Sequence, residues 1–89
     1  MATHRSAIKR HRQSLKRRQQ NRIVEGGIRK AVKRTRMAVA EGDIEAARES
    51  LQVAISRLDR AATKGVVHKN TAARSKGRLT KLVNKAAAE

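Results

Sequence analysis

The chain contains no cysteine, proline, phenylalanine, tyrosine or tryptophan, and only 5 of its 89 residues are glycine. The lack of cysteine excludes a disulfide framework, a thiol nucleophile and a cysteine-based zinc site. The lack of aromatic rings removes the usual platform for stacking unpaired bases, so any nucleic-acid binding should depend mainly on backbone charge and shape. The lack of proline and the scarcity of glycine leave long helices largely uninterrupted.

Apolar runs and catalytic groups are also scarce. No segment approaches the roughly 20 apolar residues of a membrane span. The basic N-terminus lacks the apolar run of a secretory signal, although composition only weakens a mitochondrial-type transit peptide. None of the histidines, His4, His11 and His68, lies beside a plausible nucleophile or paired carboxylates in the sequence, and two histidines on one helix face make a weak metal site. The sequence therefore predicts no enzyme, no cofactor and no metal ion.

Positive charge dominates what is present. The 23 Lys and Arg residues against 7 acids give a formal net charge of +16. A small chain with this charge repels itself when compact, and a polyanion such as nucleic acid removes the repulsion. A basic run is also typical of a solvated tail, a localisation signal or a helix on anionic lipid. The cations are densely interleaved with helix formers, and the basic segment has no coherent apolar face, so we expect a polyanion partner and no membrane.

The charge is unevenly distributed along the chain. Residues 1–24 hold eight Lys and Arg and no acid, whereas residues 41–60 hold five acids and three Arg. Residues 61–88 are basic again, with seven Lys and Arg. We expect the acids to form a solvated face or internal ion pairs, on a segment that faces away from the polyanion.

Apolar residues recur at spacings of three and four in three segments, which predicts three amphipathic helices. The three stripes are Val24, Ile28, Ala31, Thr35, Ala38 and Val39; Ile44, Ala47, Leu51, Ala54, Ile55, Leu58 and Ala62; and Ala72, Ser75, Leu79, Leu82, Val83 and Ala86. Gly42 and Gly65 suit helix C-termini, and Asp43 and Asn70 suit N-caps. We predict one domain over residues 1–89, with helices at about 4–41, 43–64 and 69–87. Short turns make neighbours antiparallel, so the expected fold is an all-α, three-helix, up-down-up bundle.

Residues 4–23 differ from the rest of the first predicted helix. Their few apolar side chains include Ile8 and Leu15, which point roughly opposite to the stripe that begins at Val24. A helix that is polar on nearly all sides has no reason to dock on its own bundle. We therefore expect these residues to project as a basic arm, with a possible bend at Gly26-Gly27.

Three segments of the chain resemble the bacterial small-subunit ribosomal protein S20 family. The first is residues 6–10, followed by Arg12, Arg17-Arg18 and Asn21-Arg22, and the second is residues 40–43 leading into Ala46 and Ala47. The third and most specific runs from residue 58 through residues 64–70 to residue 79. The likeness extends over nearly the whole chain, and it departs from the family at Gly26-Gly27 and Gly77, where small polar residues are common.

The resemblance implies a three-helix bundle with an extended first helix. It also implies a cytoplasmic protein that binds 16S ribosomal RNA in its 5′ domain and near the long penultimate stem, and that acts early in assembly of the small subunit. Other small-subunit ribosomal proteins are possible partners, and no homo-oligomer is expected. The predicted RNA-binding residues are Arg5, Lys9, Arg10, Arg12, Lys16, Arg17, Arg18 and Arg22 in the arm, and Lys69, Asn70, Arg74, Arg78 and Lys81 in the third helix. The alternative is a nucleoid-type protein that binds duplex DNA without sequence preference.

Overall fold

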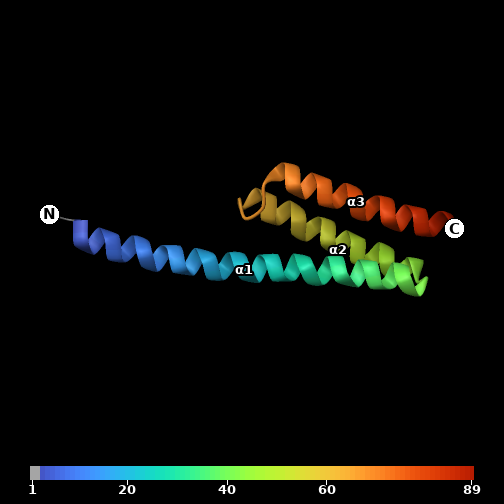
Figure 1. Cartoon of the computed structure of the whole chain (residues 1–89), viewed down its shortest axis with the longest axis horizontal. Helices are drawn as coiled ribbons and strands as arrows, with labels where there is room; N and C mark the ends of the chain where they lie inside the picture. Colours follow the sequence, from blue (N-terminus) through green and yellow to red (C-terminus); the bar gives the residue numbers. More distant parts are fainter. Residues whose placement is uncertain (1–2) are drawn as a thin grey trace.

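Three helices make up nearly all of the part of the chain that the structure describes. The computed structural model describes residues 3–89, with side chains from residue 4 onward. Helix α1 spans Thr3–Glu41, α2 spans Ile44–Thr63 and α3 spans Lys69–Ala88. Helix α2 returns along the second half of α1, and α3 then runs in the same direction as α1 (Figure 1). The predicted all-α, up-down-up bundle is confirmed.

The first turn is short because both helix ends are capped by neighbouring residues. The Asp43 N–H donates to the Ala38 carbonyl at 3.0 Å, and the Gly42 N–H donates to the Val39 carbonyl at 3.1 Å. This pair of bonds needs a left-handed residue at the turn, and Gly42 supplies it with a φ of +77°. The Asp43 carboxylate then accepts from the Ala46 N–H at 3.1 Å and caps α2. The chain consequently reverses direction with only Gly42 and Asp43 between the helices.

The second turn uses the same helix ending and a different cap. The Val66 N–H donates to the Ala61 carbonyl at 2.9 Å, around Gly65 with a φ of +78°. Asn70 was predicted to cap α3, and that prediction is wrong. His68 is the cap, since its Nδ1 atom accepts from the Asn70 N–H at 3.1 Å while its backbone is extended. The imidazole nitrogen thus does what a serine or asparagine oxygen does at most helix starts.

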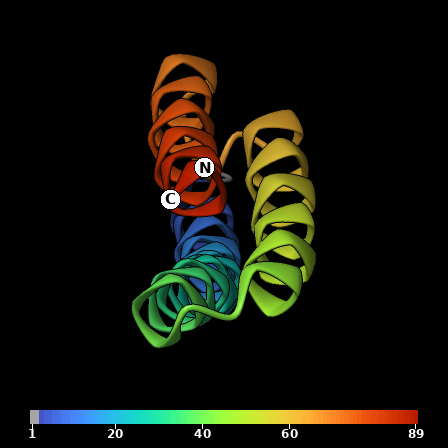
Figure 2. The same cartoon turned by 90° about the vertical axis from the view of Figure 1, so that its right-hand side faces the viewer.

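The core is small and rich in alanine. Among the described side chains, the ten buried apolar residues are Ala31, Ala38, Ala47, Leu51, Ala54, Leu58, Ala61, Ala72, Leu79 and Val83. Viewed along the bundle, the helices form a triangle (Figure 2), and α2 makes the most extensive contacts with both neighbours. Thr35 is fully buried among them, with its hydroxyl donating to the Ala31 carbonyl at 2.9 Å. Small side chains let the helix axes approach closely, so the bundle depends on a few larger residues for its apolar burial.

Two residues depart from the predicted stripes. Ala61 is fully buried, although it was not assigned to the core. Leu82 was assigned to the core but is 36% exposed. Helix α3 packs chiefly on α2 and only slightly on α1, so its buried strip is narrower than that of a helix held on two sides.

The first half of α1 leaves the bundle as predicted. Every side chain from residue 4 to residue 23 is exposed, and this arm extends alone to one side (Figure 1). It gives the molecule a longest dimension of 67 Å. The helix continues through Gly26-Gly27 without interruption, so the two glycines do not end it. An added Cβ atom at Gly27 would meet the Arg57 guanidinium, whereas Gly26 has open space.

The arm is expected to be the least stable part of the helical structure. It has helix propensity but no tertiary packing, and most helical stability in proteins comes from packing. In the free protein, backbone amides of residues 6–20 should exchange with solvent roughly a hundredfold faster than those of residues 28–38. Hydrogen exchange followed by mass spectrometry or NMR measures this ratio, and circular dichroism should show added helix when RNA binds. Equal protection of the two halves of α1 would contradict the expectation.

Candidate nucleic-acid interface

The arm presents its cations without internal partners. All eight of its predicted RNA-binding residues, Arg5, Lys9, Arg10, Arg12, Lys16, Arg17, Arg18 and Arg22, are exposed. Residues 4–24 contain no acid. Across the described side chains, residues 4–89, the single ion pair lies elsewhere in the molecule. The positive charge of the arm is therefore fully available to phosphate groups.

The cations of the arm point in several directions. At 100° per residue, Arg10 and Arg17 lie close to the line of Val24, while Arg18 and Arg22 lie on the far side of the helix. An isolated helix with charge on several faces can contact RNA segments that approach from different sides. This arrangement differs from the single basic stripe of a helix that lies along one groove.

Helix α3 carries the second basic surface. Its predicted residues, Lys69, Asn70, Arg74, Arg78 and Lys81, are all exposed. The helix begins at the same end of the bundle from which the arm departs (Figure 1). Its first turn contains no acid, so nothing there neutralises the positive end of the helix dipole. The structure therefore places the start of α3 and the base of the arm on the same end of the bundle.

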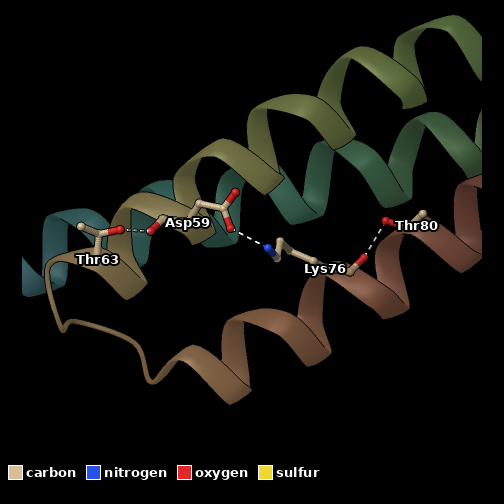
Figure 3. A network of polar contacts seen from close by, with 4 residues as sticks. All are labelled: Asp59, Thr63, Lys76 and Thr80. Atoms are coloured by element: carbon tan, nitrogen blue, oxygen red, sulfur yellow. Dashed lines mark hydrogen bonds and ion pairs between the residues drawn. The ribbon is translucent and has the colours of Figure 1, made fainter.

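One cation of α3 is already paired. Lys76 Nζ lies 2.6 Å from Asp59 Oδ1 and joins α3 to α2 (Figure 3). The backbones on both sides are braced in the same region, since the Asp59 carbonyl accepts from the Thr63 hydroxyl at 3.0 Å and the Lys76 carbonyl accepts from the Thr80 hydroxyl at 2.7 Å. At least one acid of α2 thus forms an internal ion pair. Lys76 differs in this respect from the other cations of α3, which form no ion pair within the described residues.

This pairing predicts a difference between two neighbouring cations. Arg78→Ala should reduce the slope of log K against log salt for RNA binding by about 1, which corresponds to one lost phosphate contact. Lys76→Ala should leave the slope nearly unchanged, because the lysine charge is already compensated by Asp59. Fluorescence anisotropy over a salt series measures both slopes. An equal reduction in the two variants would show that Lys76 exchanges Asp59 for phosphate on binding.

Grooves on the surface contain polar residues that the sequence interpretation did not select. A groove of about 440 Å³ between α1 and α2 is lined in part by Lys30, Arg34 and Arg57. A larger groove, of about 840 Å³, lies where the arm meets the turn between α2 and α3. Its lining residues are Arg17, Gln20, Asn21, Ile23, Val24, Lys64, Gly65 and Val66. Of these, only Arg17 was predicted to bind RNA, because uncharged amides and a lysine at a helix end carry no separate signal in the sequence.

Neither a cluster of metal ligands nor a membrane-spanning helix is found in the described part of the chain. No group of three or more His, Asp or Glu side chains is placed to hold a metal ion among residues 4–89. None of the helices within residues 3–89 combines the length and apolarity needed to cross a membrane.

Comparison with known proteins identifies the family of the chain. The family model described as ribosomal protein S20 matches residues 2–84. A protein of Nitratidesulfovibrio vulgaris named small ribosomal subunit protein bS20 is 52% identical over 87 residues, which is 98% of this chain and all of the relative. Proteins of the same name from Trichlorobacter lovleyi and Geotalea daltonii are 54% and 51% identical, each over 94% of this chain and 97% of the relative. With matches of this extent, the chain belongs to the ribosomal protein S20 family.

Proposed function

We propose that the chain is a structural protein of the small ribosomal subunit that binds the RNA of that subunit directly. The observation that carries the proposal is the arm, which holds eight exposed cations and no acid outside the bundle. The family to which the chain belongs is one of structural ribosomal proteins, and the chain is not an enzyme. Location in the cytoplasm, with other small-subunit ribosomal proteins as neighbours, follows from that role.

In the proposed mechanism the bundle fixes the angle between two basic surfaces. The arm reaches RNA beyond the bundle, and the exposed face of α3 reaches RNA beside it. Phosphates from segments that are distant in the RNA sequence are neutralised together, which favours their close approach during assembly. Specificity comes mainly from the shape of the folded RNA, since no aromatic side chain is present to stack on bases.

The test compares folded small-subunit ribosomal RNA with duplex DNA. Both are titrated with the full chain at the same salt concentration and the same concentration of phosphates. We expect at least roughly tenfold tighter binding to the ribosomal RNA, because a shape-specific complex exceeds the non-specific electrostatic background. Equal affinity for the two would overturn the proposal in favour of non-specific binding to duplex DNA.

A further inference from the structure

The groove between the base of the arm and the α2–α3 turn has the chemistry of a nucleotide site. We call it the junction groove, with the lining given above. We propose that it binds a single unpaired nucleotide that is turned out of the RNA. This inference rests on the proposed function, because it places one specific contact within the same RNA interface.

The face of α1 that packs in the core is apolar along the bundle and becomes polar at this groove. Residues seven apart lie almost in line on a helix, and Val24, Ala31 and Ala38 form one such line along the bundle. One heptad toward the N-terminus from Val24, the line reaches Arg17. A parallel line through Thr35 and Ile28 reaches Asn21 in the same way.

The residues of this face become polar at the point where the other helices of the bundle no longer cover α1. Ala31, Thr35 and Ala38 are buried and Ile28 and Val24 are half-buried, whereas Asn21 and Arg17 are exposed. The α2–α3 turn still contributes Lys64, Gly65 and Val66 beside them. A face that is apolar within the bundle and carries an amide and a guanidinium under the turn is suited to a polar, anionic occupant there.

The lining offers a contact for each part of a nucleotide. Arg17 and Lys64 contribute two cations from opposite walls, which suits a phosphate. Gln20 and Asn21 each present both donors and an acceptor, which suits the edge of a base. Aliphatic carbon from Val24 and Val66 suits the faces of a base or sugar.

The size and the lining of the groove agree with this assignment. Its volume of about 840 Å³ lies within the range of about 300–1,000 Å³ for sites that enclose small molecules. The Gly65 backbone takes part in the lining with a φ of +78°, so no side chain blocks the turn side at that residue. The α2 carbonyls there already accept from the Lys64, Gly65 and Val66 N–H groups, so they do not need the ligand as a partner.

The amide side chains provide a test that leaves charge unchanged. In the variant Gln20→Ala/Asn21→Ala, binding to small-subunit ribosomal RNA should weaken on the order of tenfold, with the salt slope unaltered. Gln13→Ala/Gln19→Ala is the matched control, because it also removes two exposed amides from the arm but lies outside the groove. This control should bind like the parent chain. Alanine favours helix in both variants, so weaker helicity cannot explain the loss.

A cross-linking experiment identifies the occupant. Ile23 lines the groove and is 70% exposed, so a photoreactive benzoylphenylalanine at that position should not disturb packing. The expected result is one dominant cross-link, to a nucleotide that is unpaired in the RNA, mapped by the stop it causes in reverse transcription.

Failure of this proposal can be told apart from failure of the proposed function. If the parent chain prefers ribosomal RNA but the Gln20→Ala/Asn21→Ala variant binds as tightly as its control, the nucleotide site is wrong and the RNA-binding role stands. Cross-links spread over paired nucleotides would also overturn it, since the groove would then hold only the backbone of a duplex. If the parent chain shows no preference for ribosomal RNA, the proposed function itself fails.

Discussion

Replacement of Arg10, Arg12 and Arg18 by alanine is expected to weaken binding to small-subunit ribosomal RNA by roughly a hundredfold at moderate salt. The estimate assigns about 1 kcal/mol to each lost phosphate contact, and about 1.4 kcal/mol corresponds to a factor of ten. The three residues are exposed and lie on different sides of the arm. None of them lines the junction groove, so the variant measures the electrostatic contribution of the arm alone.

The salt dependence of binding tests this variant more specifically than the affinity does, because it counts the phosphate contacts that are lost. Each phosphate that a cation neutralises contributes about 0.7–0.9 to the slope of log K against log salt, so the loss of three should reduce the slope by about 2–3. Anisotropy titrations at four or five salt concentrations are enough to resolve that change. An unaltered slope would mean that the arm is not a contact surface.

A second triple variant separates position from total charge. Arg29, Lys33 and Arg36 are also exposed cations of α1, but they lie within the half of the helix that carries the bundle. Their replacement by alanine removes the same charge from the same helix. We expect a clearly smaller loss of affinity than in the arm variant. An equal loss would indicate that net charge, and not the projecting arm, determines binding.

The arm itself could be predicted from sequence because its exposure follows from local chemistry. A segment with cations on most sides and few apolar residues has nothing to bury, whatever the rest of the chain does. The same reasoning applies to Gly42 and Gly65, where the left-handed conformation at a helix end strongly favours glycine. In these places the residue type and the local conformation determine each other, so no tertiary information is required.

Features that depend on neighbouring helices were less predictable. Leu82 belongs to the apolar stripe of α3 by spacing, and its exposure follows only from the limited contact of α3 with α1. The pairing of Lys76 with Asp59 likewise depends on how α3 lies against α2. The His68 cap of α3 is a local contact with the Asn70 N–H, and it was missed for a different reason, since histidine is not among the preferred capping residues.

The candidate site also has a part that the sequence predicted and a part that depends on the fold. Its charged residues were identified from density of charge and from family resemblance, and their role in RNA binding stays a prediction. The junction groove was not predicted, since it exists only because the α2–α3 turn lies over residues 17–24 of α1. Gln20 and Asn21 are ordinary polar residues of a helix until that proximity is known. Their interest comes from position and not from residue type.

Leu79→Ala is expected to reduce the stability of the bundle by about 2–4 kcal/mol. Leu79 is 3% exposed and lies in the core cluster with Leu51 and Val83. A domain of this size has a total stability of only roughly 4–13 kcal/mol, and alanines form most of the core. The melting temperature, followed by circular dichroism, should therefore fall by roughly 10–20 °C.

Leu82→Ala is the matched control for this change. It removes the same atoms from the same helix three residues away, but Leu82 is 36% exposed and should lose less than about 1 kcal/mol. Added ribosomal RNA should raise the melting temperature of both variants, since a ligand that binds only the folded state stabilises it. Similar losses in the two leucine variants would contradict the packing of α3 chiefly on α2.

The leucine variants also decide whether the bundle matters for RNA binding. Leu79→Ala leaves every cation in place, so the bound complex should contact the same phosphates and keep a salt slope close to that of the parent chain. The affinity should fall, because binding must also restore the position of Lys69, Arg74 and Arg78 relative to the arm. The arm variant should do the reverse, with a reduced slope and an unchanged melting temperature, because its three residues make no core contact. If Leu79→Ala bound RNA as tightly as the parent at a temperature where the parent is folded and the variant is not, the arm alone would suffice. The fixed geometry of two basic surfaces would then be unnecessary.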